Sequence, residues 1–310
     1  MQEIGLIIYP EFQVLGLAIC SAFELANISE NREIYKISLL SEKGGLVQTS
    51  AGFGVNSSAL PLREFDTLIV MGDTSTTAIS PVLVDFLRKS APNTRRIGAV
   101  CTGAYVLAEA GLLDGLRATT HWFRALEFKR AYPRITVEED RIFITDGKIW
   151  TSAGMSASVD LALAMVEEDL GADAARLVAK QLVVYHRRSG GQSQFSVALE
   201  LQPETNRISS ALNYAKENLK SDLSVNELAA VVSLSPRQFS RIFHAETGTS
   251  PAKAIENLRV ECARNMIENG RYSIDRIASD TGFGDRERMR RAFLRAFGQP
   301  PQMIQRAYRV

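Results

Sequence analysis

The chain has 310 residues, of which 45% are hydrophobic, 23% charged and 8% aromatic, and this composition excludes a disordered, fibrous or collagen-like protein. At about 100 to 200 residues per domain, the length predicts roughly two domains. The formal charge of +1 is divided unequally, because residues 206–310 hold 17 Lys and Arg against 11 Asp and Glu, whereas residues 1–205 carry a net charge of −5. An acidic larger part joined to a basic smaller part is typical of a regulatory or catalytic domain attached to a nucleic-acid-binding domain.

No targeting, disulfide or metal signal is present in the sequence. No apolar run approaches the roughly 18 residues of a membrane-spanning helix, and the N-terminus lacks a secretory layout, so we expect a cytoplasmic protein without membrane contact. The three cysteines, Cys20, Cys101 and Cys262, are far apart and form no CxxC pair. We therefore expect reduced thiols, no metal site and no cofactor.

Residues 1–187 alternate between strand and helix patterns. Short apolar runs predict strands over residues 4–9, 35–40, 67–71, 97–100, 142–145 and 149–152. Helical spacing predicts helices over residues 14–26, 81–90, 102–110 and 156–170. This order predicts an α/β doubly wound, mostly parallel, flavodoxin-like sheet.

One strand of this domain runs directly into a cysteine, and a helix begins immediately after it. Cys101 would therefore occupy a tight strand-to-helix turn at the carboxyl end of the sheet, where ligands of such folds bind. The helix N-terminus is expected to favour the thiolate of Cys101 and to lower its pKa. For Cys20 and Cys262 a structural thiol is the favoured interpretation.

The segments Val100–Ala104, Gly111–Gly115 and Ala118–Trp122 resemble the PfpI branch of the class I glutamine amidotransferase-like superfamily, and the resemblance spans roughly residues 3–187. In catalytic relatives such as isocyanide hydratases the cysteine is the nucleophile and an acidic side chain contacts it. Cys101 and His121 match that pattern, but the acidic position falls on Gly16. Where relatives have two glycines after a strand, this chain has Gly72 and then Asp73.

We interpret this domain as a non-catalytic ligand sensor, because a nucleophile without an activating partner loses orders of magnitude in rate. The expected ligand-binding residues, which converge at the strand ends, are Gly72, Asp73, Cys101, Thr102 and His121. No catalytic residue is assigned. Two alternatives stay open: a cysteine-dependent hydratase or amidase-like enzyme, and a thiol redox sensor.

A break in all periodicity follows residue 187. Arg188, Gly190, Gly191 and the residues up to Thr205 show neither helix nor strand spacing, and charge changes sign across them. We therefore predict a sensor domain over residues 1–187, a linker over 188–205 and a DNA-binding domain over 206–310.

The last hundred residues contain an internal repeat. The segment that begins at Ser224 aligns with the one that begins at Ser273, an offset of 49 residues. Further along, Phe239 and Phe243 recur as Met289 and Phe293, an offset of 50, so the second copy has one extra residue in the turn. Each copy reads as helix, short turn, helix, with Ser235 and Asp285 as expected N-caps of the second helices.

The second helix of each copy is the expected recognition helix of a helix-turn-helix unit. Its core-facing positions are apolar, and its other positions are rich in arginine and glutamine, which contact base edges and phosphates. The expected DNA-binding residues are Arg237, Gln238, Ser240 and Arg241 in the first copy, and Arg286, Glu287, Arg288, Arg290 and Arg291 in the second.

Two such units joined by a long helix over about residues 251–269 resemble the AraC/XylS family of transcriptional regulators, and the combination with a PfpI-like domain resembles the GlxA family of regulators. The resemblance implies a ligand-responsive, sequence-specific regulator that senses a small nitrogen-containing metabolite near Cys101. The implied partners are double-stranded promoter DNA, the small-molecule effector, a second copy of the chain in a homodimer, and RNA polymerase if the protein is an activator. In that family the two recognition helices enter successive major-groove segments about one helical turn apart.

Overall fold

The computed structural model divides into two compact units, Met1–Gln194 and Phe195–Val310. It describes residues 1–74, 78–184, 188, 190, 194, 201, 205–268 and 272–307. Most of the predicted linker, residues 188–205, lies outside the described residues. Arg188, Gly190 and Gln194 of that segment belong to the first unit, and Leu201 belongs to the core of the second.

An eight-stranded sheet forms the centre of the first unit, in the order β3-β4-β2-β1-β5-β6-β10-β9. Its strands are β1 (Gln2–Ile7), β2 (Tyr35–Ser41), β3 (Lys43–Gln48), β4 (Gly54–Ala59), β5 (Thr67–Val70), β6 (Arg96–Val100), β9 (Phe143–Asp146) and β10 (Ile149–Ser152). The inner pairs are parallel, and an antiparallel pair closes each edge, β3 with β4 and β9 with β10. A separate parallel pair joins β7 (Arg117–Ala118) to β8 (Thr136–Val137).

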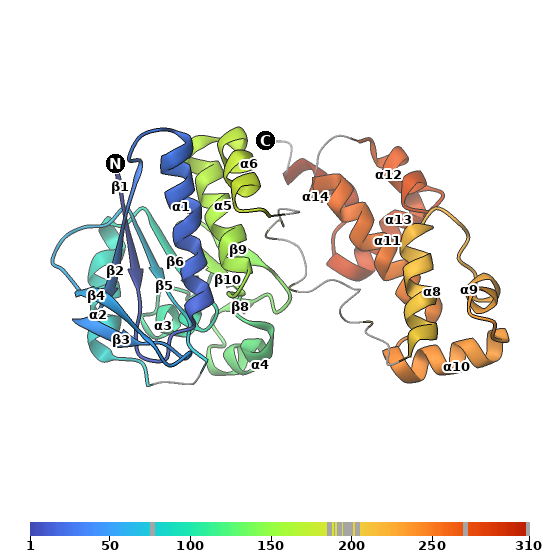
Figure 1. Ribbon diagram of the computed structural model, residues 1–310, viewed down its shortest axis with the longest axis horizontal. Coiled ribbons are helices and arrows are strands. Elements are labelled where there is room, and N and C mark those ends of the chain that lie inside the picture. The colour runs from blue at the N-terminus through green and yellow to red at the C-terminus, as the bar shows by residue number, and fades with distance from the viewer. Residues whose placement is uncertain are drawn as a thin grey trace. The chain divides into compact units, whose positions relative to one another are not determined.

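Helices cover both faces of the sheet (Figure 1). The helices α1 (Ala18–Ser29), α5 (Ala157–Leu170) and α6 (Ala172–Gln181) lie side by side over one face. On the other face lie α2 (Pro81–Ser90), α3 (Gly103–Glu109) and α4 (Trp122–Ala131). Side chains alternate along a strand, so Ile4 and Leu6 of β1 pack in the first layer while Ile7 packs in the second. Burial on both faces explains the near-continuous apolar runs.

The predicted doubly wound, mostly parallel fold is confirmed, with differences at its edges. The segment predicted as one helix over residues 14–26 is a 3-10 turn at Val14–Leu17 followed by α1. The sequence patterns do not predict β3, the edge strand, or β4 beside it, because both are rich in glycine or serine and most of their residues are exposed or half-buried. Their stability comes from pairing with each other and with β2 rather than from local apolar periodicity.

A buried charged group ties the amino end of the sheet to α5. Arg96 and Asp169 are each 2% exposed at the side chain and form an ion pair. Asp169 also accepts hydrogen bonds from Arg95 and from the hydroxyl of Tyr35, each at 2.9 Å. Burial would raise the pKa of Asp169, but the hydrogen bonds from Arg95 and Arg96 outweigh burial and hold that pKa below its usual range.

The second unit is wholly helical in its described residues. Its helices are α8 (Asn206–Glu217), α9 (Val225–Val231), α10 (Pro236–Thr247), α11 (Pro251–Glu268), α12 (Ile274–Asp280), α13 (Arg286–Phe297) and α14 (Pro301–Ala307). Two apolar clusters build it, one around Phe239 and Phe243, the other around Met289 and Phe293. No helix within the described residues has the length and apolarity needed to cross a membrane.

The two predicted helix-turn-helix units are α9–α10 and α12–α13. Ser235 caps α10 in a reciprocal capping box with Gln238, and the Asp285 carboxylate accepts a hydrogen bond from the amide of Arg288 at 2.8 Å. Gly248 and Gly298 end α10 and α13 in the left-handed conformation, as expected for C-cap glycines. The same caps thus recur at corresponding positions of the two copies.

Asp169→Asn is expected to lower the free energy of unfolding by about 3 kcal/mol at pH 7, because it removes the buried carboxylate that pairs with Arg96 and leaves only the more exposed Glu168, at 3.1 Å, as a close counter-charge. Since the folded-state pKa of Asp169 is depressed, its contribution is complete above about pH 4 and is lost as pH falls through the folded-state value. Urea unfolding of the wild type and of Asp169→Asn at several pH values measures the difference. The two plots of unfolding free energy against pH should converge at low pH. Asp173→Asn, at an exposed ion pair on α6, is the matched control and should change little; an equal loss there would contradict the assignment.

Candidate ligand cavity and DNA-binding surface

Cys101 forms the turn between β6 and α3 and has a backbone φ of 55°, in the left-handed region that non-glycine residues rarely adopt. Two glycines make room for it. A Cβ on Gly72 would lie 2.6 Å from the Cys101 Cβ, and one on Gly154 would lie 2.3 Å from it. The predicted strand-to-helix turn is therefore present, and glycines on two neighbouring loops enclose it.

The expectation that the helix N-terminus lowers the pKa of Cys101 is wrong. Burial raises the pKa of this thiol, and the negative charge of Asp73 raises it further, although hydrogen bonds from Thr102 oppose the change. The aligned acidic position, Gly16, is also in apolar surroundings, since a Cβ there would lie 3.2 Å from the sulfur of Met71 and 3.6 Å from Val100. The described surroundings of Cys101 therefore favour a protonated thiol.

A cavity of about 1140 Å³ lies at the carboxyl ends of the parallel strands. Tyr9 follows β1, Glu42 follows β2, Asp73 follows β5 and Thr102 follows β6, and each side chain lines it. Its polar and charged lining includes Tyr9, Ser41, Glu42, Lys43, Gln48, Asp73, Ser80, Arg88, Thr102, Tyr105, Glu109, Arg124, Glu127 and Tyr132. The position agrees with the general rule for ligand sites in open α/β sheets.

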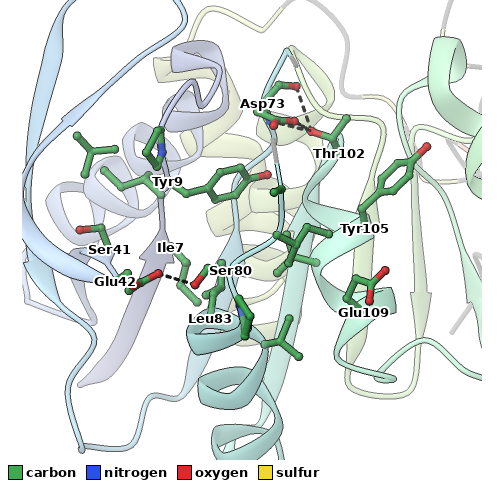
Figure 2. Close-up of a pocket in the computed structure, with 18 of the residues that line it drawn as sticks. Ile7, Tyr9, Ser41, Glu42, Asp73, Ser80, Leu83, Thr102, Tyr105 and Glu109 are labelled. Carbon is green, nitrogen blue, oxygen red and sulfur yellow. Dashed lines mark hydrogen bonds between the residues drawn. The ribbon is translucent and has the colours of Figure 1, made fainter. Parts of the chain in front are cut away.

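On one wall of the cavity, Tyr9 points toward Asp73 and Thr102 (Figure 2). The Thr102 hydroxyl donates to the Asp73 carboxylate at 2.8 Å and accepts from the Asp73 amide at 2.7 Å. Burial and the charge of Asp73 raise the pKa of Tyr9, which keeps its hydroxyl a neutral donor. This wall presents a phenol beside a carboxylate that Thr102 holds in place.

The opposite wall comes from α3 and α4. The hydroxyl of Tyr105 donates to the Arg124 carbonyl at 3.1 Å, and the Arg124 guanidinium pairs with Glu127 at 2.6 Å. Tyr132 donates to Glu109 at 2.6 Å, and this hydrogen bond helps to raise the pKa of Tyr132, after burial. This wall thus presents two tyrosines and two carboxylates to the cavity.

Of the five predicted ligand-binding residues, Asp73 and Thr102 are among the described residues that line the cavity. Gly72 and Cys101 precede them in the chain, and a Cβ on Gly72 would lie within 2.7 Å of both Cys101 and Thr102. His121 is the N-cap residue before α4, where its Nδ1 accepts a hydrogen bond from the amide of Phe123 at 3.4 Å, and burial lowers the pKa of His121. Its ring therefore acts as a helix cap.

Sequence reasoning missed the tyrosines and most of the carboxylates of the cavity. The rule that ligands bind at the carboxyl ends of parallel strands predicts Tyr9 and Glu42 as well as Asp73, because each of them follows such a strand. Tyr105 and Glu109 are four residues apart on α3 and therefore share one face, but only the packing of α3 shows that this face lines the cavity. No group of three or more metal-ligating side chains occurs in the ranges that the structure describes.

The predicted DNA-binding residues lie on α10 and α13, outside the apolar core. Arg237, Gln238 and Arg241 are exposed and Ser240 is half-buried. The carboxamide oxygen of Gln238 takes part in the capping box, so its side-chain NH2 is the group that remains as a donor.

On α13 the predicted residues are all exposed, and several pair with acidic neighbours. Arg290 pairs with Glu287 at 3.1 Å. Arg286 approaches Asp275 at 3.8 Å, and Arg288 approaches Asp285 at 3.9 Å. These are contacts of exposed groups, which DNA can replace at little cost.

Both units match known protein families. Residues 20–168 match the DJ-1/PfpI family, and residues 228–307 match a helix-turn-helix domain. The chain is 31% identical to the HTH-type transcriptional regulator CdhR of Pseudomonas aeruginosa, over 97% of this chain and 90% of that protein. It is 30% identical to the HTH-type transcriptional regulator GlxA of Rhizobium meliloti, over 99% of this chain and 96% of that protein.

Two further similarities cover only part of the chain. An isonitrile hydratase of Pseudomonas putida is 43% identical over 101 residues, which cover 32% of this chain and 42% of that enzyme. The crystal structure of an AraC family transcriptional regulator from Pseudomonas putida aligns with a TM-score of 0.55 and 22% identity, covering 59% of this chain and all of that one. This structural similarity supports the fold of the aligned part.

The thiol of Cys101 is expected to react more slowly with iodoacetamide at pH 7 than a free cysteine does. Each unit by which its pKa is raised should lower the rate about tenfold, because only the thiolate reacts. The Cys20→Ser, Cys262→Ser double variant isolates Cys101, and mass spectrometry across a pH series measures its rate against a free cysteine peptide. The rate should still be rising above pH 9. A plateau below pH 8 would indicate a low-pKa thiolate and contradict the assignment.

Proposed function

Because the chain belongs to the AraC-type transcriptional regulators that carry an N-terminal DJ-1/PfpI domain, we propose that it binds specific promoter sequences through α10 and α13 and responds to a small nitrogen-containing metabolite in the cavity of the first unit. The observation that carries the proposal is the pair of capped helix-turn-helix units, each with an exposed polar recognition helix. Full-length similarity to regulators supports it.

The lining of the cavity supports a nitrogen-containing ligand. Tyr9, Tyr105 and Tyr132 supply aromatic faces, which attract cationic nitrogen, and the carboxylates outnumber the cationic groups. Arg124 and Arg88 are already engaged, the first by Glu127 and the second by the carbonyls of Ala110 and Glu109. A positively charged amine therefore suits the cavity better than an anion.

Gln194 supplies a route from the cavity to the linker. Its amide donates to Asp140 at 2.8 Å, its side-chain NH2 donates to the Thr120 carbonyl at 2.8 Å, and its oxygen accepts from the Trp122 amide at 2.8 Å. Trp122 begins α4, the helix that carries Arg124 and Glu127 to the cavity. A ligand that moves α4 would thus move the residue at which the first unit ends.

Enzymatic turnover is the second candidate, and the left-handed turn at Cys101 together with the partial similarity to an isonitrile hydratase favours it. The raised pKa of Cys101 and the glycine at position 16 argue against it. Every ligand found for the protein should therefore be checked for chemical conversion by mass spectrometry. Conversion that Cys101→Ala abolishes would replace the sensor assignment by a catalytic one.

Recognition-helix variants test the DNA-binding part. A duplex selected from a random pool by the full chain serves as the operator. Arg241→Ala in α10 and Arg286→Ala in α13 should each lower affinity by about 1–3 kcal/mol and relax base preference at separate positions, about one helical turn apart. Binding isotherms on single-base variants of the operator measure this. Arg306→Ala, at an exposed arginine on α14, is the control; a chain that selects no sequence at all would refute the assignment.

Gln194→Ala tests the coupling. A thermal-shift panel of amines, amino acids, betaines and nitriles on the full chain first identifies a stabilising ligand, whose effect on operator affinity is then measured. We expect Gln194→Ala to keep the thermal shift but to lose most of the effect on DNA affinity, because the ligand cavity is intact while the linker is released. Gln181→Ala, at an exposed glutamine of α6 that bonds Ser29, is the matched control. An unchanged DNA response in Gln194→Ala would contradict the route.

A further inference from the structure

The arginines of α13 fall on two stripes of the helix rather than on one. Arg286 and Arg290 are four residues apart and share one stripe, whereas Arg288, Arg291 and Arg295 repeat at intervals of three and four and share another. The second stripe faces α11, where Glu256 and Arg259 lie. Together with the turn before α13 these residues enclose a pocket of about 350 Å³.

Positive charge in this pocket exceeds negative charge. Four arginines line it, against the single carboxylate of Glu256, which already pairs with Arg295 and with Lys253. The hydrogen bonds from Arg295 and Lys253 hold the pKa of Glu256 low despite burial. The Glu256 carboxylate therefore neutralises these two cations rather than the other arginines of the pocket. The remaining three arginines have no comparable counter-charge.

In each of these three arginines, the charge of the guanidinium is not neutralised by a close carboxylate. Arg259 donates to the carbonyls of Leu219 at 3.2 Å and Ser221 at 2.6 Å, which are neutral acceptors. Burial lowers the pKa of Arg259, and the nearby charge of Arg288 lowers it further, against the opposing effect of Asp222. Arg288 approaches one carboxylate at 3.9 Å, and Arg291 makes no hydrogen bond or ion pair with the residues that the structure describes.

We infer that the pocket between α11 and α13 is a phosphate-binding site that holds one backbone phosphate of the DNA duplex read by α13. A guanidinium presents a planar set of donors that fits phosphate oxygens, and an anion would relieve the mutual repulsion of Arg259, Arg288 and Arg291. The inference rests on the proposed DNA-binding function and gives the two stripes of α13 different tasks. The first stripe contacts bases, and the second contacts the DNA backbone and so positions the helix on the duplex.

The pocket lies where the two halves of the second unit are joined. Arg259 is bonded to the loop after α8, and Gly282, in the turn before α13, has a φ of 76°. A Cβ on Gly282 would lie 1.9 Å from the carbonyl oxygen of Leu219, so this loop and this turn are in direct backbone contact. A phosphate bound here therefore fixes the position of both helix-turn-helix units on the duplex.

The test compares Arg291→Ala with Arg286→Ala in the full chain, on the selected operator and on a scrambled duplex, over a series of KCl concentrations. Arg291→Ala should weaken binding to both duplexes by a similar factor, leave their affinity ratio unchanged, and make the slope of log K against log salt shallower by about 0.9. Arg286→Ala should instead reduce the ratio. Arg288→Ala is a second variant with the same expectation as Arg291→Ala, and Arg306→Ala controls for loss of a positive charge elsewhere.

Three outcomes would overturn the inference. In the first, Arg291→Ala leaves the salt slope unchanged, and in the second its main effect is to reduce the ratio of the two affinities. In the third, the pocket binds a free anion instead of DNA: inorganic phosphate at fixed ionic strength raises the melting temperature of the wild type but not that of Arg291→Ala, and the salt slope is the same for both. Failure of the wild type to select any duplex refutes the proposed function itself, whereas normal DNA binding by Arg291→Ala refutes only the phosphate site.

Discussion

The first unit depends on one strained backbone position, the turn at Cys101. A cysteine with a φ of 55° survives there because Gly72 and Gly154 leave space on both sides of it. The turn lets α3 begin directly beneath the end of β5, where a Cβ on Gly103 would lie 2.4 Å from the Val70 carbonyl oxygen. Close packing of helix on strand places Thr102 against Asp73 and so builds one wall of the cavity.

The same turn also organises the loop that leads to α4. The Thr120 hydroxyl donates to the Cys101 carbonyl at 2.8 Å, and the Thr120 carbonyl in turn accepts from Gln194. The wall of the cavity, the turn at Cys101 and Gln194 are therefore connected through hydrogen bonds. In this arrangement the backbone of Cys101 is held by Thr120 and its thiol is buried, which raises the pKa of the thiol.

The second unit uses a repeated device for a different purpose. Both copies start the recognition helix with a side-chain cap and end it with a left-handed glycine, so helix length and position are set locally. The two copies are joined by α11, and Arg259 on that helix and Gly282 both contact the carbonyl oxygen of Leu219 in the loop after α8. Rigid spacing of two recognition helices is what reading successive major-groove segments requires.

The amino-acid sequence alone determined the parallel core of the sheet, the turn at Cys101 and the two helix-turn-helix units, because these depend on short-range patterns: apolar runs, caps, glycines and an internal repeat. It also placed Asp73 and Thr102 at the carboxyl ends of the strands, where the cavity lies, since both follow parallel strands. Tertiary structure decided the rest. Strands β3 and β4 are stabilised by pairing, and the pKa of Cys101 is governed by burial. The positions of Tyr9 and Tyr105 in the cavity and of Arg291 in the pocket follow from which elements pack against them. Burial, pairing and charge balance arise only when distant segments of the chain meet.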